Sequence, residues 1–358
     1  MNSSQANTEG DPYHGPESES EATAQIDEWY NAGKPLFTRE AMVSIRDQLR
    51  AGVVRGDQIL AKGLDGEVYK YNVHTGKVRE HHPYEFDENG LGREDKTREK
   101  ERWIFDPPLI RYNAYSHLKQ DLSWNLEKAY VSMGVVHYMT LLKDEPPDAL
   151  PDVEVGLDSF NATLEQWERG EAWGEIKSTL LSLELRGKIT NIIGMASGRF
   201  TAAHNERASR RSTIQNGFLV LLKKTLEESH LGTDNVPCFA QDPAYSLNDR
   251  EILSRSGLDV VDDPDGFLHT DDTSLVFSCA PNICVKEVIT DISRPLILIW
   301  CEVGDEPRKE SCTDPDSPRV IEMIKTEYDK LPFPKDDGDD FSSMAIYVKK
   351  AARVTHLN

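Results

Sequence analysis

A serine lies in a turn of small residues within the stretch of the chain that is most suggestive of chemistry. The stretch runs from Lys188 to Gln215, and Ser197 stands between Ala196 and Gly198. A serine hydroxyl becomes a nucleophile when another group takes its proton and donors stabilise the oxyanion. Gly194 and Gly198 would let the backbone approach a bound substrate closely. Ser197 is therefore the candidate nucleophile, although serine is also common in such turns because it is small and caps helices.

Basic residues follow the serine turn on a segment with helical spacing. They are Arg199, Arg207, Arg210, Arg211, Lys223 and Lys224, with His204 among them. The formal net charge of −21 argues against general affinity for nucleic acid, because phosphate binding depends on Lys and Arg. A local basic face remains compatible with a phosphate-bearing partner, and the alternative is a solvated helix face with a few ion pairs.

The elements around the turn alternate between strands and helices. Strand-like runs cover Ile189 to Met195, Val236 to Ala240, Asp259 to Val261, Ser274 to Ser278 and Leu296 to Cys301, with helical runs at Ile214 to Ser229, Asn248 to Ser256 and Ile283 to Ile289. This alternation implies right-handed crossovers and a mostly parallel sheet with helices on both faces. We predict an α/β fold with a Rossmann-like domain over residues 185–358. A helix at Arg319 to Tyr328 and a strand at Ser343 to Val348 would complete it.

The position of the turn after a strand raises the question of a nucleotide cofactor. Open α/β sheets bind ligands at the carboxyl ends of their strands. The segment 194–198 lacks the third glycine of the dinucleotide fingerprint, and no acidic residue stands at the expected distance. A nucleotide- or methyl-donor-binding enzyme is therefore a poorly supported third option, and we predict no cofactor.

The first half of the chain is predicted as a tail and a mixed α+β extension. Residues 1–24 are polar and acidic, which is typical of disorder, and residues 25–184 form the extension. Thr38 has the type and position of a helix N-cap, and a charged loop is expected over residues 83–101. Short strands with tight turns are expected at Gln58 to Arg79, and helices at Tyr115 to Leu142, Asn161 to Arg169 and Glu171 to Leu185.

Composition limits the class of protein. The chain has 358 residues, without an apolar run of about 18 residues or a signal-peptide pattern at its start. We expect an intracellular, cytoplasmic protein that does not act on membranes. Five cysteines without a CxxC pair indicate neither a disulfide framework nor a zinc site, so no metal is expected.

Several motifs occur in a fixed order in the second half of the chain. The strand with the GMASGRF turn is followed by Ser212 to Gln215, Gln241 to Pro243, Leu258 to Val261 and Ser274 to Asn282. This set resembles the "sensitivity to red light reduced" (SRR-like) domain, in the form carried by filamentous fungi. The resemblance covers about Lys188 to Trp300. Many members carry an Asn-Ser pair after the last strand, where this chain has Trp300, Cys301 and Glu302.

The resemblance implies two classes of function. Plant, yeast and animal members look like regulatory proteins without settled catalytic chemistry. Fungal chains of this build include arginine-containing cyclodipeptide synthases, which are enzymes of secondary metabolism that join two aminoacyl groups taken from charged tRNAs. Bacterial cyclodipeptide synthases, with a Rossmann-like fold, also place a nucleophilic serine in a turn after the first strand, and Ser197 has a similar place.

The enzyme interpretation assigns roles around the serine. Ser197 would attack the aminoacyl ester, and the backbone amides of Gly198 and Arg199, at a helix N-terminus, would hold the oxyanion. His204 would move the proton. Asp242 or Tyr245, at the end of the next strand, would bind the α-amine of the aminoacyl group. His204 is more typical of a surface histidine, and Asp242 before a proline is a common turn residue.

The arginine side chain and the tRNA need sites of their own. Asp262 and Asp263 could pair with a guanidinium through bidentate hydrogen bonds, although their segment also reads as a turn. The basic helix from Arg199 to Lys224 would hold the acceptor stem. The predicted partners are arginyl-tRNA and a second aminoacyl-tRNA. The alternative is a non-catalytic regulator whose sheet and acidic ends bind other proteins.

Overall fold

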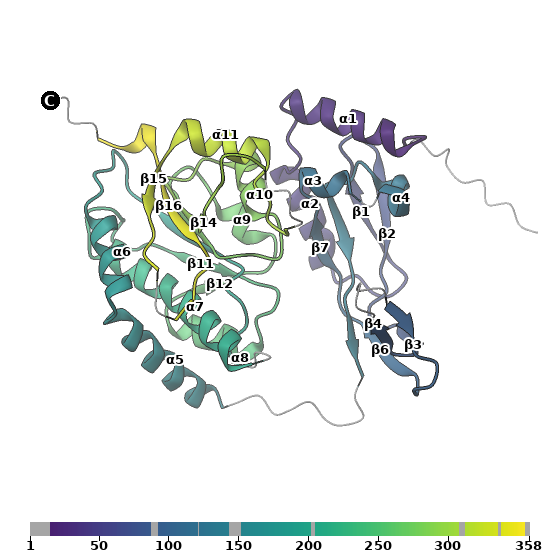
Figure 1. Ribbon diagram of the computed structural model, residues 1–358. Helices are drawn as coiled ribbons and strands as arrows, with labels where there is room; N and C mark the ends of the chain where they lie inside the picture. Colours follow the sequence, from purple (N-terminus) through teal and green to yellow (C-terminus); the bar gives the residue numbers. More distant parts are fainter. Residues whose placement is uncertain are drawn as a thin grey trace, which may run out of the picture.

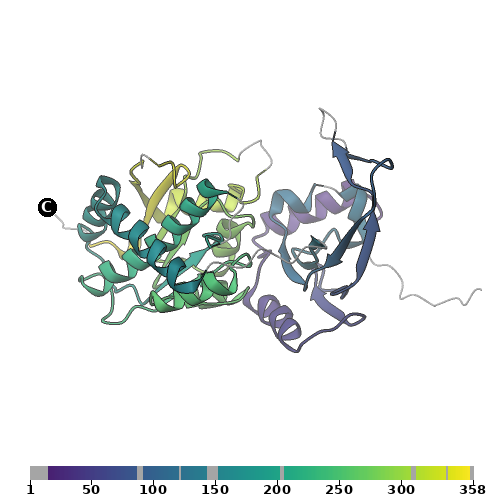
Figure 2. The ribbon, with the colours of Figure 1, turned by 90° about the horizontal axis from the view of Figure 1, so that it is seen from below.

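The computed structural model describes residues 15–86, 92–120, 122–142, 152–201, 205–307, 312–335 and 338–354. Two bodies lie side by side in Figures 1 and 2. One is an α/β body built around a large sheet, and the other is formed by the N-terminal half of the chain. His204 lies outside the described residues, as do residues 1–14 of the predicted tail.

A seven-stranded sheet with the order β12-β11-β10-β13-β14-β16-β15 organises the α/β body. Its strands are β10 (Asn191–Met195), β11 (Cys238–Gln241), β12 (Asp259–Val260), β13 (Ser274–Ser278), β14 (Ile297–Cys301), β15 (Tyr328–Pro332) and β16 (Met344–Lys349). Strands β10 to β14 are parallel, and β16 is antiparallel to both of its neighbours. The predicted α/β class with a mostly parallel sheet is confirmed. Because the strand order reverses between β10 and β13, their carboxyl ends form the place where open α/β sheets bind ligands.

Helices cover both faces of this sheet. One face packs against α5 (Val153–Glu168), α6 (Glu171–Leu181), α7 (Glu206–Glu227) and α8 (Leu247–Arg255), and the other against α9 (Asp265–His269), α10 (Val285–Ile292) and α11 (Pro318–Glu327). The strand residues alternate between the two cores. Ile192 and Phe277 belong to the first core, whereas their chain neighbours Ile193 and Val276 belong to the second. Strands buried on both faces have this continuous apolar character, which is why the sequence revealed them.

Helices α5 and α6 belong physically to the α/β body. Phe160 and Trp167 of α5 share a hydrophobic core with Phe218 of α7 and with the sheet. The predicted boundary at residue 185 leaves both helices with the N-terminal extension, whereas their apolar faces pack on the sheet side. Helix α5 also begins at Val153, earlier than the predicted Asn161, because Asp152 caps it by accepting a hydrogen bond from the backbone of Glu154.

The N-terminal half contains short helices and small antiparallel sheets. Its strands pair as β1-β2, β3-β6-β9, β4-β5 and β7-β8. The helices are α1 (Glu19–Asn31), α2 (Arg39–Arg50), α3 (Tyr115–Leu118), α4 (Leu122–Asn125) and the 3-10 turn η1 (Leu126–Lys128), and a second 3-10 turn, η2 (Lys350–Ala352), follows β16. The strands are β1 (Gln58–Lys62), β2 (Val68–Asn72), β3 (Val78–His81), β4 (Tyr84–Phe86), β5 (Gly92–Glu94), β6 (Glu101–Phe105), β7 (Leu109–Tyr112), β8 (Met133–Val136) and β9 (Met139–Leu141).

The N-terminal half packs on the helical layer formed by α9, α10 and α11. Asp291 of α10 accepts hydrogen bonds from the backbone of Leu36 at 2.7 Å and of Phe37 at 3.1 Å. Arg319 of α11 pairs with Asp291 at 3.1 Å and donates to the carbonyl of Lys34 at 2.8 Å. A buried carboxylate such as Asp291 needs both its ion pair and its backbone donors. Because these partners come from both bodies, the contacts fix how the two bodies meet.

Some predicted elements are confirmed and others are wrong. Thr38 caps α2 by accepting from the backbone of Ala41, as predicted. The long helix predicted at Tyr115 to Leu142 is wrong, because the chain forms the short helical segments α3, α4 and η1 and then the strands β8 and β9. Gly134 and the valines that follow it favour extended structure, and β8 pairs with β7.

Two further corrections concern polar segments. Within the predicted loop over residues 83–101, β4 and β5 form an antiparallel pair. Residues 19–24, predicted as part of a disordered tail, form the first turns of α1, which Ser18 caps. Ala22 and Ile26 bury one face of this helix, and that burial outweighs the polar composition of the segment.

Among the described residues, no helix combines the length and apolar character that a membrane-spanning segment needs.

Candidate functional site

The candidate site is the turn that follows β10 at the carboxyl edge of the sheet. Ala196 has φ +57° and Gly198 has φ +81°, so two of the three residues of this turn have left-handed backbone conformations. The turn after the neighbouring strand β13 contains Ala280 with φ +49°. Non-glycine residues in this region carry strain, and such strain gathers at functional turns. Two strained turns therefore lie at the ends of the two central strands.

Two carboxylates hold the turn in place. Asp242 Oδ2 accepts a hydrogen bond from the backbone amide of Gly198 at 2.7 Å, and its Oδ1 accepts from Ala244 at 2.8 Å. Asp249 Oδ1 accepts from the amides of Phe200 at 3.2 Å and Thr201 at 2.8 Å. The segment after Ser197 is thus fastened to the loop after β11.

The Ser197 hydroxyl is buried within this arrangement. Ser197 is 1% exposed, and its Oγ forms no hydrogen bond of ordinary geometry with a described residue. It lies close enough to Tyr245 for the contact to lower the pKa of that phenol, against the larger rise that burial causes. Tyr245 itself donates to Asn216 Oδ1 at 2.6 Å, and Asn216 Nδ2 donates to the carbonyl of Gly198 at 3.1 Å. The serine therefore faces a fixed polar network.

The electrostatics of the site are dominated by carboxylates. Burial is the largest cause that raises the pKa of Asp242, and the nearby charge of Asp249 adds to it. Asp242 is 8% and Asp249 0% exposed, and neither forms an ion pair with a residue that the structure describes. Backbone amides stabilise the two carboxylates, which have no ion pair among the described residues to offset their charge.

The geometry corrects the predicted oxyanion site. Helix α7 begins at Glu206 after the N-cap Asn205, so Gly198 and Arg199 do not stand at a helix N-terminus. The amide of Gly198 already donates to Asp242. Gly194 lies within β10, where an added Cβ would overlap the side chain of Leu219, so the close approach at Gly194 is made by a helix. The small residues of the turn thus serve packing as well as the backbone conformation.

The two aspartates predicted to bind a guanidinium point to partners within the protein. Asp262 pairs with Arg250 at 2.6 Å. Asp263 Oδ1 accepts from the phenol of Tyr112 at 2.7 Å and from Gln241 Nε2 at 2.9 Å. Burial raises the pKa of Asp263 to about 7. These contacts leave Asp263 as a link between the N-terminal half and the ends of β11 and β12.

Most of the predicted tRNA-binding residues are paired with acidic side chains. The pairs are Arg207–Asp339 at 2.6 Å, Arg210–Asp340 at 2.8 Å, Lys223–Glu227 at 2.6 Å and Lys224–Glu168 at 3.0 Å. Arg199 and Arg211 are half-buried, and their Nε atoms have no partner among the described residues. For these four paired residues, a solvated helix face with ion pairs fits the structure better than a free tRNA-binding face.

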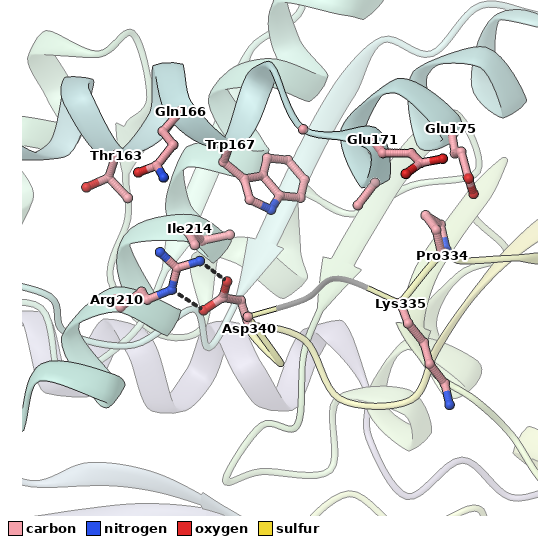
Figure 3. Close-up of a pocket in the computed structure, with 13 residues that line it drawn as sticks. Thr163, Gln166, Trp167, Glu171, Glu175, Arg210, Ile214, Pro334, Lys335 and Asp340 are labelled. Carbon is pink, nitrogen blue, oxygen red and sulfur yellow. Dashed lines mark hydrogen bonds and ion pairs between the residues drawn. The ribbon is translucent and has the colours of Figure 1, made fainter.

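A cavity of about 530 Å³ lies on the other side of α7, between α5, α6 and the segment that precedes β16. Figure 3 shows Arg210 in this cavity, where its Nε and Nη2 contact the two carboxylate oxygens of Asp340 at 3.1 and 2.8 Å. Glu171 and Glu175 also line it. A second cavity, of about 980 Å³, lies where the N-terminal half meets the residues before α10. Ser197, Asp242 and Tyr245 line neither of these two cavities.

Three residues of the site were missed by the sequence prediction. Asn216 lies in the middle of α7, and Gln241 is the last residue of β11. Tyr112 comes from the N-terminal half. A polar residue within an otherwise apolar helix face was the available signal for Asn216, because such a residue needs a buried partner. Nothing local in the sequence pointed to Tyr112.

Comparison with known proteins assigns the second half of the chain. Residues 171–348 match the model of the SRR1 domain, which confirms the SRR-like resemblance and extends it beyond the predicted limits. No curated protein and no solved structure matches the chain. The description of the sheet as Rossmann-like therefore stays a prediction.

Proposed function

We propose, from the SRR1 domain that the second half of the chain contains, that this protein transfers aminoacyl groups from charged tRNAs. In this proposal Ser197 is the nucleophile, and arginine is joined to a second aminoacyl group as a cyclic dipeptide. The supporting observation is the buried Ser197 hydroxyl at the end of a central strand. Its Oγ has no hydrogen bond of ordinary geometry within the described part of the chain, and the two carboxylates beside it form no ion pair there.

The uncompensated carboxylates fit the chemistry of an aminoacyl group. An aminoacyl ester carries an α-ammonium group next to the carbonyl that a nucleophile attacks. Asp242 and Asp249 supply two buried negative charges beside the Ser197 turn. A bound α-ammonium would offset their burial and would lower the raised pKa of Asp242. The carboxylates therefore favour a cationic substrate over an anionic one.

The polar network gives the serine a defined orientation. Because the Tyr245 phenol donates to Asn216, its oxygen is left as an acceptor, and the Ser197 hydroxyl lies beside it. In the proposed step, Ser197 Oγ bonds to the ester carbonyl carbon and the 3′-oxygen of the tRNA leaves with a proton. The amine of the second aminoacyl-tRNA then displaces Ser197, which regains its proton. The arginyl α-amine finally attacks the ester of the second residue, which closes the ring and releases the second tRNA with the amine proton on its oxygen. Tyr245 positions the serine in this sequence.

The test is to detect the cyclic dipeptide product and the covalent aminoacyl-enzyme intermediate. Extracts of a heterologous host that expresses the full chain would be searched by mass spectrometry for arginine plus a second amino acid minus two waters. Purified protein would be incubated with arginyl-tRNA labelled in the amino acid, and labelled protein would be digested. The expected result is a cyclic dipeptide and a label on the peptide that contains Ser197.

A matched pair of variants makes this test specific. Ser197→Ala should lose both the label and the product. Ser254→Ala changes an exposed serine of α8 in the same domain and should keep both. Full product from Ser197→Ala would exclude the nucleophile role.

The alternative is a non-catalytic regulator that acts through protein partners. The observation that favours it is the pairing of the basic residues of α7 with the protein's own acidic side chains, which reduces the charge available to tRNA. Soluble protein that gives neither label nor product, and that binds a defined protein partner, would support this alternative.

A further inference from the structure

The cavity of about 980 Å³ between the two bodies has an unusual composition for this chain. The whole sequence contains 62 Asp and Glu residues against 41 Lys and Arg, yet none of the described residues that line this cavity is acidic. Its basic side chains are Arg111, Lys128 and His117. Its size lies within the range of small-molecule sites, which is about 300–1,000 Å³. The cavity is therefore a positive site in a strongly negative protein.

Arg111 and Lys128 both lie near the aromatic ring of Tyr71. The Nζ of Lys128 lies 3.9 Å from the ring centre of Tyr71. Arg111 lies close enough to Tyr71 for its charge to lower the pKa of the phenol, while burial raises that pKa to about 12. Neither Arg111 nor Lys128 forms an ion pair with a side chain in the described part of the chain. Arg111 donates through Nε to Asn113 at 3.0 Å, which orients the guanidinium and leaves its two terminal nitrogens available.

The opposite wall is formed by residues that precede α10. Asn282 and Ile283 line the cavity there, and the backbone amide of Lys286 at the start of the helix already donates to Asp314. His117 is fixed by a bond of 2.9 Å between its Nε2 and the carbonyl of Cys312. The carboxylate of Asp314, behind this wall, is paired with Lys286 at 3.9 Å and accepts from its backbone at 3.0 Å. That acidic group is thereby already compensated.

We propose that this cavity binds a phosphate-bearing small molecule of nucleotide size. Two cations that face one cavity without a carboxylate among its described lining residues call for a ligand with more than one negative charge, and a diphosphate supplies this on few atoms. The amides of Asn113, Asn282 and neighbouring side chains would contact its polar groups. Since the cavity takes residues from both bodies, the ligand would bind across their interface.

This site is separate from the one proposed above for aminoacyl transfer. Ser197 and Asp242 do not line the cavity. The two sites also differ in charge, since carboxylates dominate around Ser197 and bases dominate here. Failure of the aminoacyl-transfer proposal would leave the cavity and its bases unchanged.

The experiment is isothermal titration calorimetry of the full chain with inorganic pyrophosphate and, separately, with ATP. We expect saturable binding of at least one of the two. Lys128→Met and Arg111→Gln should each weaken it about tenfold or more, because each removes a charge-assisted contact. Lys70→Met is the matched control: it removes a positive charge from an exposed residue next to Tyr71 in β2 and should leave the affinity unchanged.

A second measurement locates the bound anion. Pyrophosphate should slow amide hydrogen exchange at residues 111–128 and at the residues before α10, and Lys128→Arg should keep binding. Absence of binding by both probes, or equal weakening by Lys128→Met and Lys70→Met, would overturn the proposal. It would also be overturned if Lys128→Met weakened tRNA binding while neither probe bound the unchanged protein, because the bases would then serve a nucleic acid.

Discussion

The phenol of Tyr112 donates a hydrogen bond of 2.7 Å to Oδ1 of Asp263, and this contact joins the N-terminal half to the loop after β12. Gln241 donates to the same oxygen at 2.9 Å. Burial nevertheless raises the pKa of Asp263 to about 7, and the neighbouring charge of Asp265 adds to the rise. The interface therefore contains a carboxyl group whose protonation changes within the physiological range.

The first prediction is a fall in stability as pH rises through this range. The pKa of Asp263 is about 7 in the folded protein, against the ordinary aspartate value of 3.8 in the unfolded chain. Between these values the unfolded chain binds fewer protons, so the free energy of unfolding falls by up to about 1.4 kcal/mol per pH unit from this group. Urea denaturation between pH 4 and pH 8 measures the effect.

Asp263→Asn is the variant that isolates this group. The amide oxygen can still accept from Tyr112 and Gln241, but the side chain no longer ionises. Relative to the unchanged protein, the variant should gain stability from pH 4 to about pH 7 and change little above it. Glu287→Gln gives a comparison, since burial also raises the pKa of Glu287 to about 7. Parallel pH profiles for Asp263→Asn and the unchanged protein would contradict the prediction.

Local sequence patterns predicted the strands of the large sheet because each strand is apolar on both faces. Ser274–Ser278 forms β13 with the predicted bounds, and β10 and β14 differ from their predicted bounds by one or two residues. The edge strand β15 was missed, since Tyr328–Pro332 alternates buried and exposed residues and contains charged ones. The backbone hydrogen bonds of β15 come from its pairing with β16, which its local sequence does not indicate.

Contacts between distant residues explain why the site was only partly predictable. Ser197 and Asp242 were placed correctly at the ends of neighbouring strands, because the carboxyl ends of parallel strands share one edge. The pairing of Arg210 with Asp340 spans 130 positions. A run of basic residues therefore suggested a free face where the folded chain has ion pairs.

The second prediction concerns packing at the centre of the sheet. Gly194→Ala would place a methyl group against the side chain of Leu219 in α7, which would have to shift, and should destabilise the protein by about 1–3 kcal/mol. Gly174→Ala is the matched control, because an added Cβ meets nothing within 4 Å in α6. Helix propensity should make that variant more stable by about 0.5–1 kcal/mol. Denaturation midpoints of the two variants test the pair, and a neutral Gly194→Ala would show that Leu219 can move.

The third prediction concerns the cysteines. All five are free, and burial raises the pKa values of Cys238 and Cys284. Because the thiolate is the reactive form, these two should react slowly with a thiol reagent at pH 8 while the protein is folded. Cys312 is only half-buried and should react before them. Mass spectrometry of partly labelled protein gives the order, and early labelling of Cys284 would contradict the burial described here.

The last prediction separates structural from functional roles at the Ser197 turn. A buried hydroxyl without a hydrogen bond contributes no net stability, so Ser197→Ala should change the free energy of unfolding by less than about 1 kcal/mol, or raise it. Tyr245→Phe should lower it by about 1–3 kcal/mol, because Asn216 Oδ1 loses the donor at 2.6 Å. Thermal denaturation of both variants beside the product assay makes the comparison. A serine kept for the fold would give the reverse order, with Ser197→Ala the less stable protein. A serine that can be removed without loss of stability, yet not without loss of product, has chemistry as its remaining role.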